Sequence, residues 1–82
     1  MIHVSIMADR ARDFTGGVSE LEIEATTVGR MIAELNRLYP GLGDFVEDHA
    51  AIAIDGEIHQ DALGSALSPG AEVVVIPRIG GG

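Results

Sequence analysis

The stretch AEVVVIP, residues 71–77, decides how the rest of the chain is read. Four apolar residues, Val73 to Ile76, stand in a row inside it, and three of them are valines, which favour strands. A continuous apolar run, in place of an alternating one, is typical of a strand buried on both faces. Pro77 then removes a backbone donor and ends the pairing. The pattern therefore predicts a central strand that ends at residue 77.

Two hairpins are expected upstream of this strand. Residues 2–7 (IHVSIM) alternate between apolar and polar side chains, and residues 18–25 (VSELEIEA) do the same with an acidic outer face. The segment between them, residues 8–17, ends in two glycines, a turn signal. Residues 51–58 (AIAIDGEI) carry Asp55-Gly56 between apolar runs, which is a strong signal for a two-residue hairpin.

The hydrophobic period changes between the two hairpins, where helical spacing replaces alternation. Either Thr26 or Thr27 can cap the start of this helix, and Pro40-Gly41 ends it. Residues 42–50 are expected to form a loop or a short helical turn. The apolar positions of the helix are Val28, Met31, Ile32, Leu35, Leu38 and Tyr39, and those of the following segment are Leu42, Phe45 and Val46.

The order of these elements predicts an α+β fold. One main helix lies across one face of a mixed sheet of four to five strands, with the first and last strands adjacent and parallel in the middle. This is a β-grasp, or ubiquitin-like, arrangement. We expect the β-grasp domain to span residues 1–77 and a flexible tail ending in Gly-Gly to span residues 78–82.

The composition excludes several classes of protein. A chain of 82 residues makes one domain, and 46% hydrophobic residues with 4% aromatic residues predict an aliphatic core. The chain has no cysteine, which rules out disulfides and thiolate zinc sites and fits a cytoplasmic protein. No apolar run approaches the length of a membrane span, so no membrane partner is expected. The net charge of −8 repels nucleic acid and favours a partner with a basic docking surface.

No catalytic apparatus is visible in the body of the domain. The motifs of P-loops, serine hydrolases and zinc peptidases are missing. Acidic and histidine side chains gather in one region, but their spacing matches no set of metal ligands, so we expect a solvated acidic surface and no metal site. These residues are Asp44, Glu47, Asp48, His49, His59 and Asp61. His3 is expected to be a strand residue whose ring is hydrogen-bonded.

The tail is where chemistry can lie. Its five residues, extended, reach about 17 Å, and glycine has no Cβ to obstruct a narrow channel. A carboxylate is a poor acyl donor until ATP converts it to an acyl-adenylate. Attack by sulfide or a persulfide then gives a thiocarboxylate. A side chain on Gly81 or Gly82 would hinder that attack, which makes the terminal carboxylate the expected reactive group.

Three segments of the chain resemble the ubiquitin-like sulfur carriers. They are the helix TVGRMIAELNRLYPGL, the hairpin AIAIDGE and the ending ALSPGAEVVVIPRIGGG, in which D/E-V-x-x-x-P-x-x-x-G-G is the specific part. This family contains the small subunit of molybdopterin synthase and the carrier of the thiamine pathway. The resemblance implies that an E1-like adenylyltransferase activates Gly82 with ATP, and that Gly82 then carries sulfur as a thiocarboxylate, with no bound cofactor. It also implies that Gly81 is the penultimate glycine of the tunnel, and that Pro77, Arg78, Ile79 and Gly80 form the approach to it.

The resemblance implies an acceptor enzyme as the second partner. The hairpin AIAIDGE is closer to the molybdopterin type, so we expect this chain to be the small subunit of molybdopterin synthase, with the large subunit as its acceptor. The stretch RDFTGG (residues 12–17) is similar to carriers of cysteine biosynthesis, which makes cysteine the next alternative. A thiamine or another sulfur pathway also stays open. We expect docking on the exposed face of the sheet beside the tail, with Glu20, Glu22, Glu24 and Glu72 as its acidic part.

Two further functions stay open beside sulfur transfer. The same tail could form isopeptide bonds as a protein modifier, although a chain without lysine cannot offer side chains for building polymers of itself. Alternatively, the domain could act by non-covalent binding alone, with idle glycines.

Overall fold

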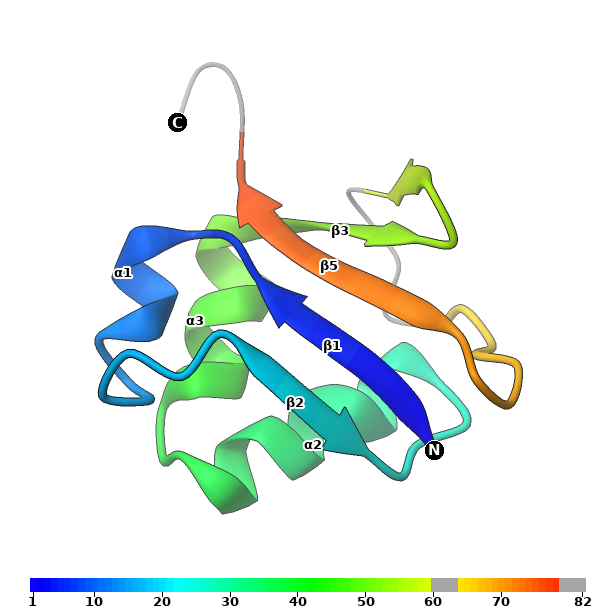
Figure 1. The fold of residues 1–82 in the computed structure, drawn as a ribbon, viewed down its shortest axis with the longest axis horizontal. Helices are drawn as coiled ribbons and strands as arrows, with labels where there is room; N and C mark the ends of the chain where they lie inside the picture. Colours follow the sequence, from blue (N-terminus) through cyan, green and yellow to red (C-terminus); the bar gives the residue numbers. More distant parts are fainter. Residues whose placement is uncertain (60–63, 79–82) are drawn as a thin grey trace.

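The structure, a computed structural model, describes residues 1–59 and 64–78. Within them the strands and the main helix follow one another in the expected order, and two short helices are present in addition (Figure 1). The elements are β1 (Ile2–Ile6), α1 (Asp9–Arg12), β2 (Glu20–Ile23), α2 (Val28–Leu38), α3 (Leu42–His49), β3 (Ala50–Ile54), β4 (Glu57–His59) and β5 (Glu72–Pro77).

The sheet has five strands in the order β2-β1-β5-β3-β4. Strand β5 lies at its centre, parallel to β1 and antiparallel to β3, and the other pairs are antiparallel. The parallel pairing brings the two most distant strands of the chain together, as the sequence predicts. Figure 1 shows α2 and α3 packed behind the sheet, α1 beyond the end of β1, and the N-terminus at the opposite end of the molecule from the point where β5 ends. This confirms the β-grasp arrangement.

Strand β5 is buried on one face, so the expectation of burial on both faces was wrong. Val73 and Val75 point toward the helices and are fully buried, whereas Val74 and Ile76 are half-buried on the other side. The helices cover only one face of the sheet, and neighbouring strands cover the flanks of β5. The continuous apolar run therefore marks a central strand together with an apolar patch on the open face.

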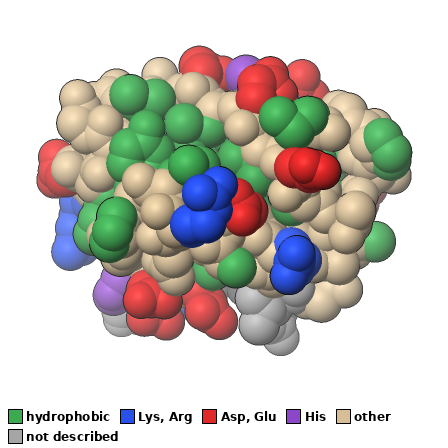
Figure 2. Space-filling model, turned by 90° about the horizontal axis from the view of Figure 1, so that it is seen from below, with side chains coloured by type: hydrophobic (Ala, Val, Ile, Leu, Met, Phe, Trp, Pro, Cys, Tyr) green, Lys and Arg blue, Asp and Glu red, His purple; other side chains and the backbone are tan. Residues whose placement is uncertain are grey.

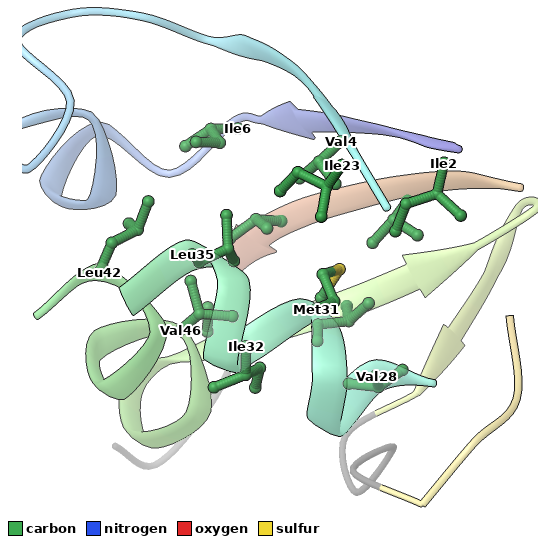
Figure 3. Packing of buried hydrophobic residues seen from close by; sticks show 14 of the residues in the cluster. Ile2, Val4, Ile6, Ile23, Val28, Met31, Ile32, Leu35, Leu42 and Val46 are labelled. Carbon is green, nitrogen blue, oxygen red and sulfur yellow. The ribbon is translucent and has the colours of Figure 1, made fainter. Parts of the chain in front are cut away.

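The core lies between the sheet and the helices α2 and α3 (Figure 3). It is aliphatic, as the composition predicts. Its largest fully buried side chains come from five elements, β1, β2, α2, α3 and β5: Ile2, Val4, Ile6, Ile23, Val28, Met31, Leu35, Leu42, Val46, Val73 and Val75.

Helix α3 is longer than the loop or short turn expected for residues 42–50. Leu42 and Val46 are fully buried and Phe45 is partly buried, so the three expected anchors lie on the side of α3 that faces the core. Gly43 packs directly on α2, where a Cβ would lie 2.3 Å from the carbonyl oxygen of Ile32. Tertiary packing, which local sequence does not report, therefore stabilises this short helix.

Local signals in the sequence agree with the observed turns and caps. The Thr27 hydroxyl accepts a hydrogen bond from the Arg30 amide at 3.1 Å, so Thr27 is the N-cap of α2. Asp55 and Gly56 both have positive φ, 48° and 89°, as a type I′ hairpin turn requires. None of the helices in the described parts of the chain has the length and apolar character needed to cross a membrane.

Candidate functional site

The candidate site begins where β5 ends. Pro77 is the last residue of the strand and pairs with Ala50 at the start of β3. It is exposed, and so is the residue that follows it, Arg78. The centre of the sheet thus delivers the chain to the molecular surface at residue 78. The remaining predicted site residues, Ile79, Gly80, Gly81 and Gly82, lie outside the described residues.

The Arg78 side chain turns back onto the body of the domain. Its guanidinium donates hydrogen bonds to the carbonyl oxygens of Glu47, Asp48 and Ala50, each at 3.2 Å. Glu47 and Asp48 lie in the last turn of α3, where carbonyl groups have no partner within the helix. A cation at this end also meets the negative pole of the helix dipole. Arg78 therefore caps α3.

A groove of about 570 Å³ opens beside Arg78, between α1, α3 and the end of β5. Phe45 forms its apolar wall, with its ring centroid 5.2 Å from that of His49 and 5.5 Å from that of Phe14. The Arg10 guanidinium carbon lies 5.3 Å from the Phe45 centroid, a cation–π distance. The point from which the tail leaves is therefore flanked by a groove with both apolar and cationic walls.

The open face of the sheet has an apolar half near the end of β5. Val74 and Ile76 of β5 lie beside Ala53 and Ala51 of β3, their partners in the strand register. Ile58, which pairs with Ala53, is 63% exposed. Met7, at the end of β1, is 60% exposed. Large apolar side chains left open near the end of β5 indicate a docking surface.

The other half of the open face is acidic and contains a histidine. The strand register places His3 of β1 opposite Glu22 of β2 and Glu72 of β5, and Ser5 opposite Glu20. His3 Nδ1 bonds Glu22 at 2.9 Å, and His3 Nε2 bonds Glu20. Figure 2 shows acidic side chains gathered on two opposite edges of one face of the molecule, each with a histidine beside them. Of the predicted acidic set, Glu24 lies beyond β2.

These contacts shift the acid–base properties of the cluster. The hydrogen bond to Glu22, and to a lesser extent the one to Glu20, raises the pKa of His3 to about 9. Hydrogen bonds from His3 and Ser5 lower the pKa of Glu20. His3 is therefore charged at neutral pH, and it offsets part of the negative charge of this surface.

The acidic residues considered as metal ligands do not converge. Asp44 accepts a hydrogen bond from Asn36 at 3.2 Å, and Glu47, Asp48 and His49 are exposed on α3. Asp61 lies outside the described residues. Within residues 1–59 and 64–78, no group of three or more histidine or acidic side chains is placed to hold a metal ion.

Sequence reasoning did not predict the hydrogen bonds of Arg78. Arg78 was expected to line the approach to the tunnel of the partner enzyme. Its hydrogen bonds to backbone carbonyl oxygens could not be predicted, because every residue has such a carbonyl and the pattern of side chains does not identify the partners. The expectation that His3 is a strand residue with a hydrogen-bonded ring is confirmed, with Glu22 and Glu20 as its partners. These partners could have been predicted, because alternation in residues 2–7 and 18–25 places histidine and glutamate on the same face once the two strands are paired.

Comparison with known proteins places the chain in a family. The model of the ThiS family matches residues 7–82. Comparison with curated proteins gives no match.

Solved structures share the fold. Mycobacterium tuberculosis CysO superposes with a TM-score of 0.83 at 22% identity, over 96% of this chain and 100% of that one. A chain of the Amycolatopsis orientalis BexX/CysO complex gives 0.83 at 19% identity, over 100% of both chains. SAMP1 from Haloferax volcanii gives 0.69 at 26% identity, over 99% of this chain and 98% of that one.

The family match thus covers α1 to β5 and the glycine tail, and the superposition with CysO covers 96% of this chain. The chain belongs to the ThiS family of ubiquitin-like sulfur carriers.

Proposed function

We propose that Gly82 is the working residue of this carrier. An E1-like adenylyltransferase transfers AMP from ATP to the Gly82 carboxylate and releases pyrophosphate. Hydrosulfide, or a persulfide with a reductant, then attacks the acyl carbon, AMP leaves, and a thiocarboxylate remains. The observation that carries the proposal is the family match through residue 82, on a domain whose central strand ends at the surface beside an apolar patch.

The geometry supports partners that bind the body of the domain as well as its tail. A tail of four residues after Arg78 reaches about 14 Å when extended. Any enzyme that takes Gly82 into an active site must therefore also contact the surface around the end of β5. The apolar half of the open face supplies area for that contact, and the acidic half selects a basic surface. We place the activating enzyme and the acceptor enzyme in turn on this face, in the cytoplasm.

The experiment is an activation assay read by intact mass. The protein is incubated with the E1-like enzyme of its host, ATP and a sulfide source. We expect one oxygen to be exchanged for sulfur, and no exchange when Gly82 is deleted or changed in Gly82→Ala. Gly64→Ala is the matched control, because a Cβ at Gly64 meets nothing within 4 Å. Absence of exchange with every such enzyme of the host would refute the proposal.

The acceptor is the finer part of the proposal. The hairpin AIAIDGE favoured molybdopterin synthase, but the structural neighbours include two CysO proteins. Together with the stretch RDFTGG, this similarity favours an enzyme of cysteine biosynthesis as acceptor, ahead of molybdopterin synthase. Presenting the thiocarboxylate to each purified enzyme with its co-substrate separates the two, because only the true acceptor returns the carrier to its original mass.

A protein modifier is the second candidate function. It is favoured by the similarity to Haloferax volcanii SAMP1, since proteins of that name are called small archaeal modifier proteins. Conjugation would leave a glycine remnant on lysines of target proteins. Mass spectrometry of cellular proteins for that remnant, with and without the gene, tests it.

A further inference from the structure

We infer that Arg78 is a positioning residue that sets the direction in which the tail leaves the domain. The inference rests on the proposed chemistry at Gly82. It differs from a role for Arg78 in direct contact with the enzyme, because the guanidinium is already bonded within the domain.

Arg78 is the first residue after the backbone pairing of β5 ends. The last paired residue of β5 is Pro77, which has no N–H. Its partner in the register, Ala50, has a carbonyl oxygen that accepts from Arg78 Nη2 at 3.2 Å instead. The side chain of Arg78 thus continues the attachment of the chain to β3 by one residue beyond the strand.

The acceptors are fixed points of the fold. Glu47 and Asp48 belong to the last turn of α3, and the Ala50 amide closes that helix by bonding Val46 O. Two of the three carbonyl groups therefore belong to a helix end that is packed on the core through Val46. A guanidinium attached there is held relative to the sheet and to the helix at once.

Only an arginine matches this arrangement in full. A planar guanidinium presents several N–H groups in a fixed fork, so it can bridge three carbonyl oxygens from one position. Within residues 1–59 and 64–78, no carboxylate forms an ion pair with Arg78, so its charge meets the helix dipole alone. The side chain is therefore committed to backbone acceptors.

If Arg78 is already held in the free protein, the activating enzyme loses less free energy to conformational entropy when it binds the tail. An enzyme that binds the tail must fix every residue between the domain and Gly82, and a residue already held adds little to that cost. Releasing Arg78 should weaken capture of the carrier without changing the chemical step. We expect Arg78→Met to raise the KM for the carrier about fivefold to tenfold at unchanged kcat, the cost of fixing one residue again.

The test combines enzyme kinetics with side-chain dynamics. Arg78→Lys keeps the charge at the helix end and should raise the KM less than Arg78→Met. Arg37→Met is the matched control, because Arg37 is an exposed arginine at the end of α2 that pairs with Glu34, and it should leave the KM unchanged. Nitrogen-15 relaxation of Arg78 Nε in the free wild-type protein should report a restricted side chain.

Each arm can overturn the inference. Unrestricted motion of Arg78 Nε in the free protein would show that the side chain is not held by the three carbonyl oxygens, and it would refute the inference whatever the kinetics show. An unchanged KM, or a fall in kcat, in a folded Arg78→Met variant would also refute it. If no enzyme activates the wild-type protein, the proposed function fails, while the relaxation measurement still decides whether Arg78 is held.

Discussion

A single glycine sets how closely α3 approaches α2. A Cβ at position 43 would lie 2.3 Å from the Ile32 carbonyl oxygen and 2.8 Å from Asn36 Cγ. The first of these is a backbone atom of a packed helix, so it cannot move aside. Gly43 is thus required by packing.

We predict that Gly43→Ala destabilises the domain by about 1–3 kcal/mol, the usual cost of overpacking. Urea denaturation measures this change. Gly64→Ala serves as control, since nothing lies within 4 Å of its added Cβ. A Gly43→Ala protein as stable as the control would show that the two helices separate at no cost.

The second prediction at this scale concerns His3, whose pKa rises to about 9 from the ordinary 6.5. The folded state holds the proton more tightly than the unfolded state. The resulting stabilisation is therefore complete below pH 6.5 and is lost as pH rises through about 9. In the wild-type protein the urea midpoint should therefore fall between pH 6.5 and about pH 9, and in His3→Gln this fall should be smaller.

Titration of the His3 ring by NMR provides an independent measure. A ring that titrates near its ordinary pKa would contradict the structure, in which the ring bonds both Glu20 and Glu22. Glu72 of β5 is the partner of His3 in the strand register on the other side, so the control variant Glu72→Gln shows whether its charge contributes.

At the scale of the element, α2 depends on its first hydrogen bond. The Thr27 hydroxyl accepts from the Arg30 amide, one of the amides that a helix start leaves without a partner. Thr27→Ala should cost about 1 kcal/mol in the free energy of unfolding. The neighbouring Thr26→Ala should cost less, because Thr27 alone is the N-cap. Equal losses in the two variants would argue against the cap.

The same elements show how far the sequence alone reaches. Helix α2 and the hairpin at Asp55-Gly56 follow from local period and turn chemistry, and the structure has both. Leu38 fits the period of the apolar face but is 42% exposed, because α2 ends there and the core does not extend under it. The length of α3 was underestimated, because its stability comes from contacts with α2 and the sheet, which the local sequence does not report.

The candidate site divides in the same way. The end of the central strand at Pro77 was readable, because proline interrupts a ladder wherever it stands. The bonds of Arg78 were not, because its partners are backbone carbonyls that belong to any residue. The one-sided burial of β5 was misread, since an apolar run does not say whether a second layer or a docking partner covers the other face.

At the scale of the whole molecule, the net charge of −8 should act on association. Charge complementarity accelerates encounter with a basic surface, and salt screens it. We predict that binding of the activating enzyme slows as ionic strength rises. Replacing Glu20, Glu22 and Glu72 with glutamine should reduce that dependence, as measured by stopped-flow association.

The control for this prediction removes three charges elsewhere, in Asp13→Asn, Glu34→Gln and Asp44→Asn. These residues lie on the helical side of the molecule. If both sets change the salt dependence equally, net charge alone governs association and the acidic half of the open face has no special part in it.

The parallel pairing of β1 with β5 has a consequence for biosynthesis. Of the described strands, β5 is the last along the chain, yet it fills the centre of the sheet. The sheet cannot close around its middle while the ribosome still holds that segment, and contacts between such distant parts of a chain form late. A nascent chain therefore completes its sheet only after β5, Glu72–Pro77, has emerged from the ribosome.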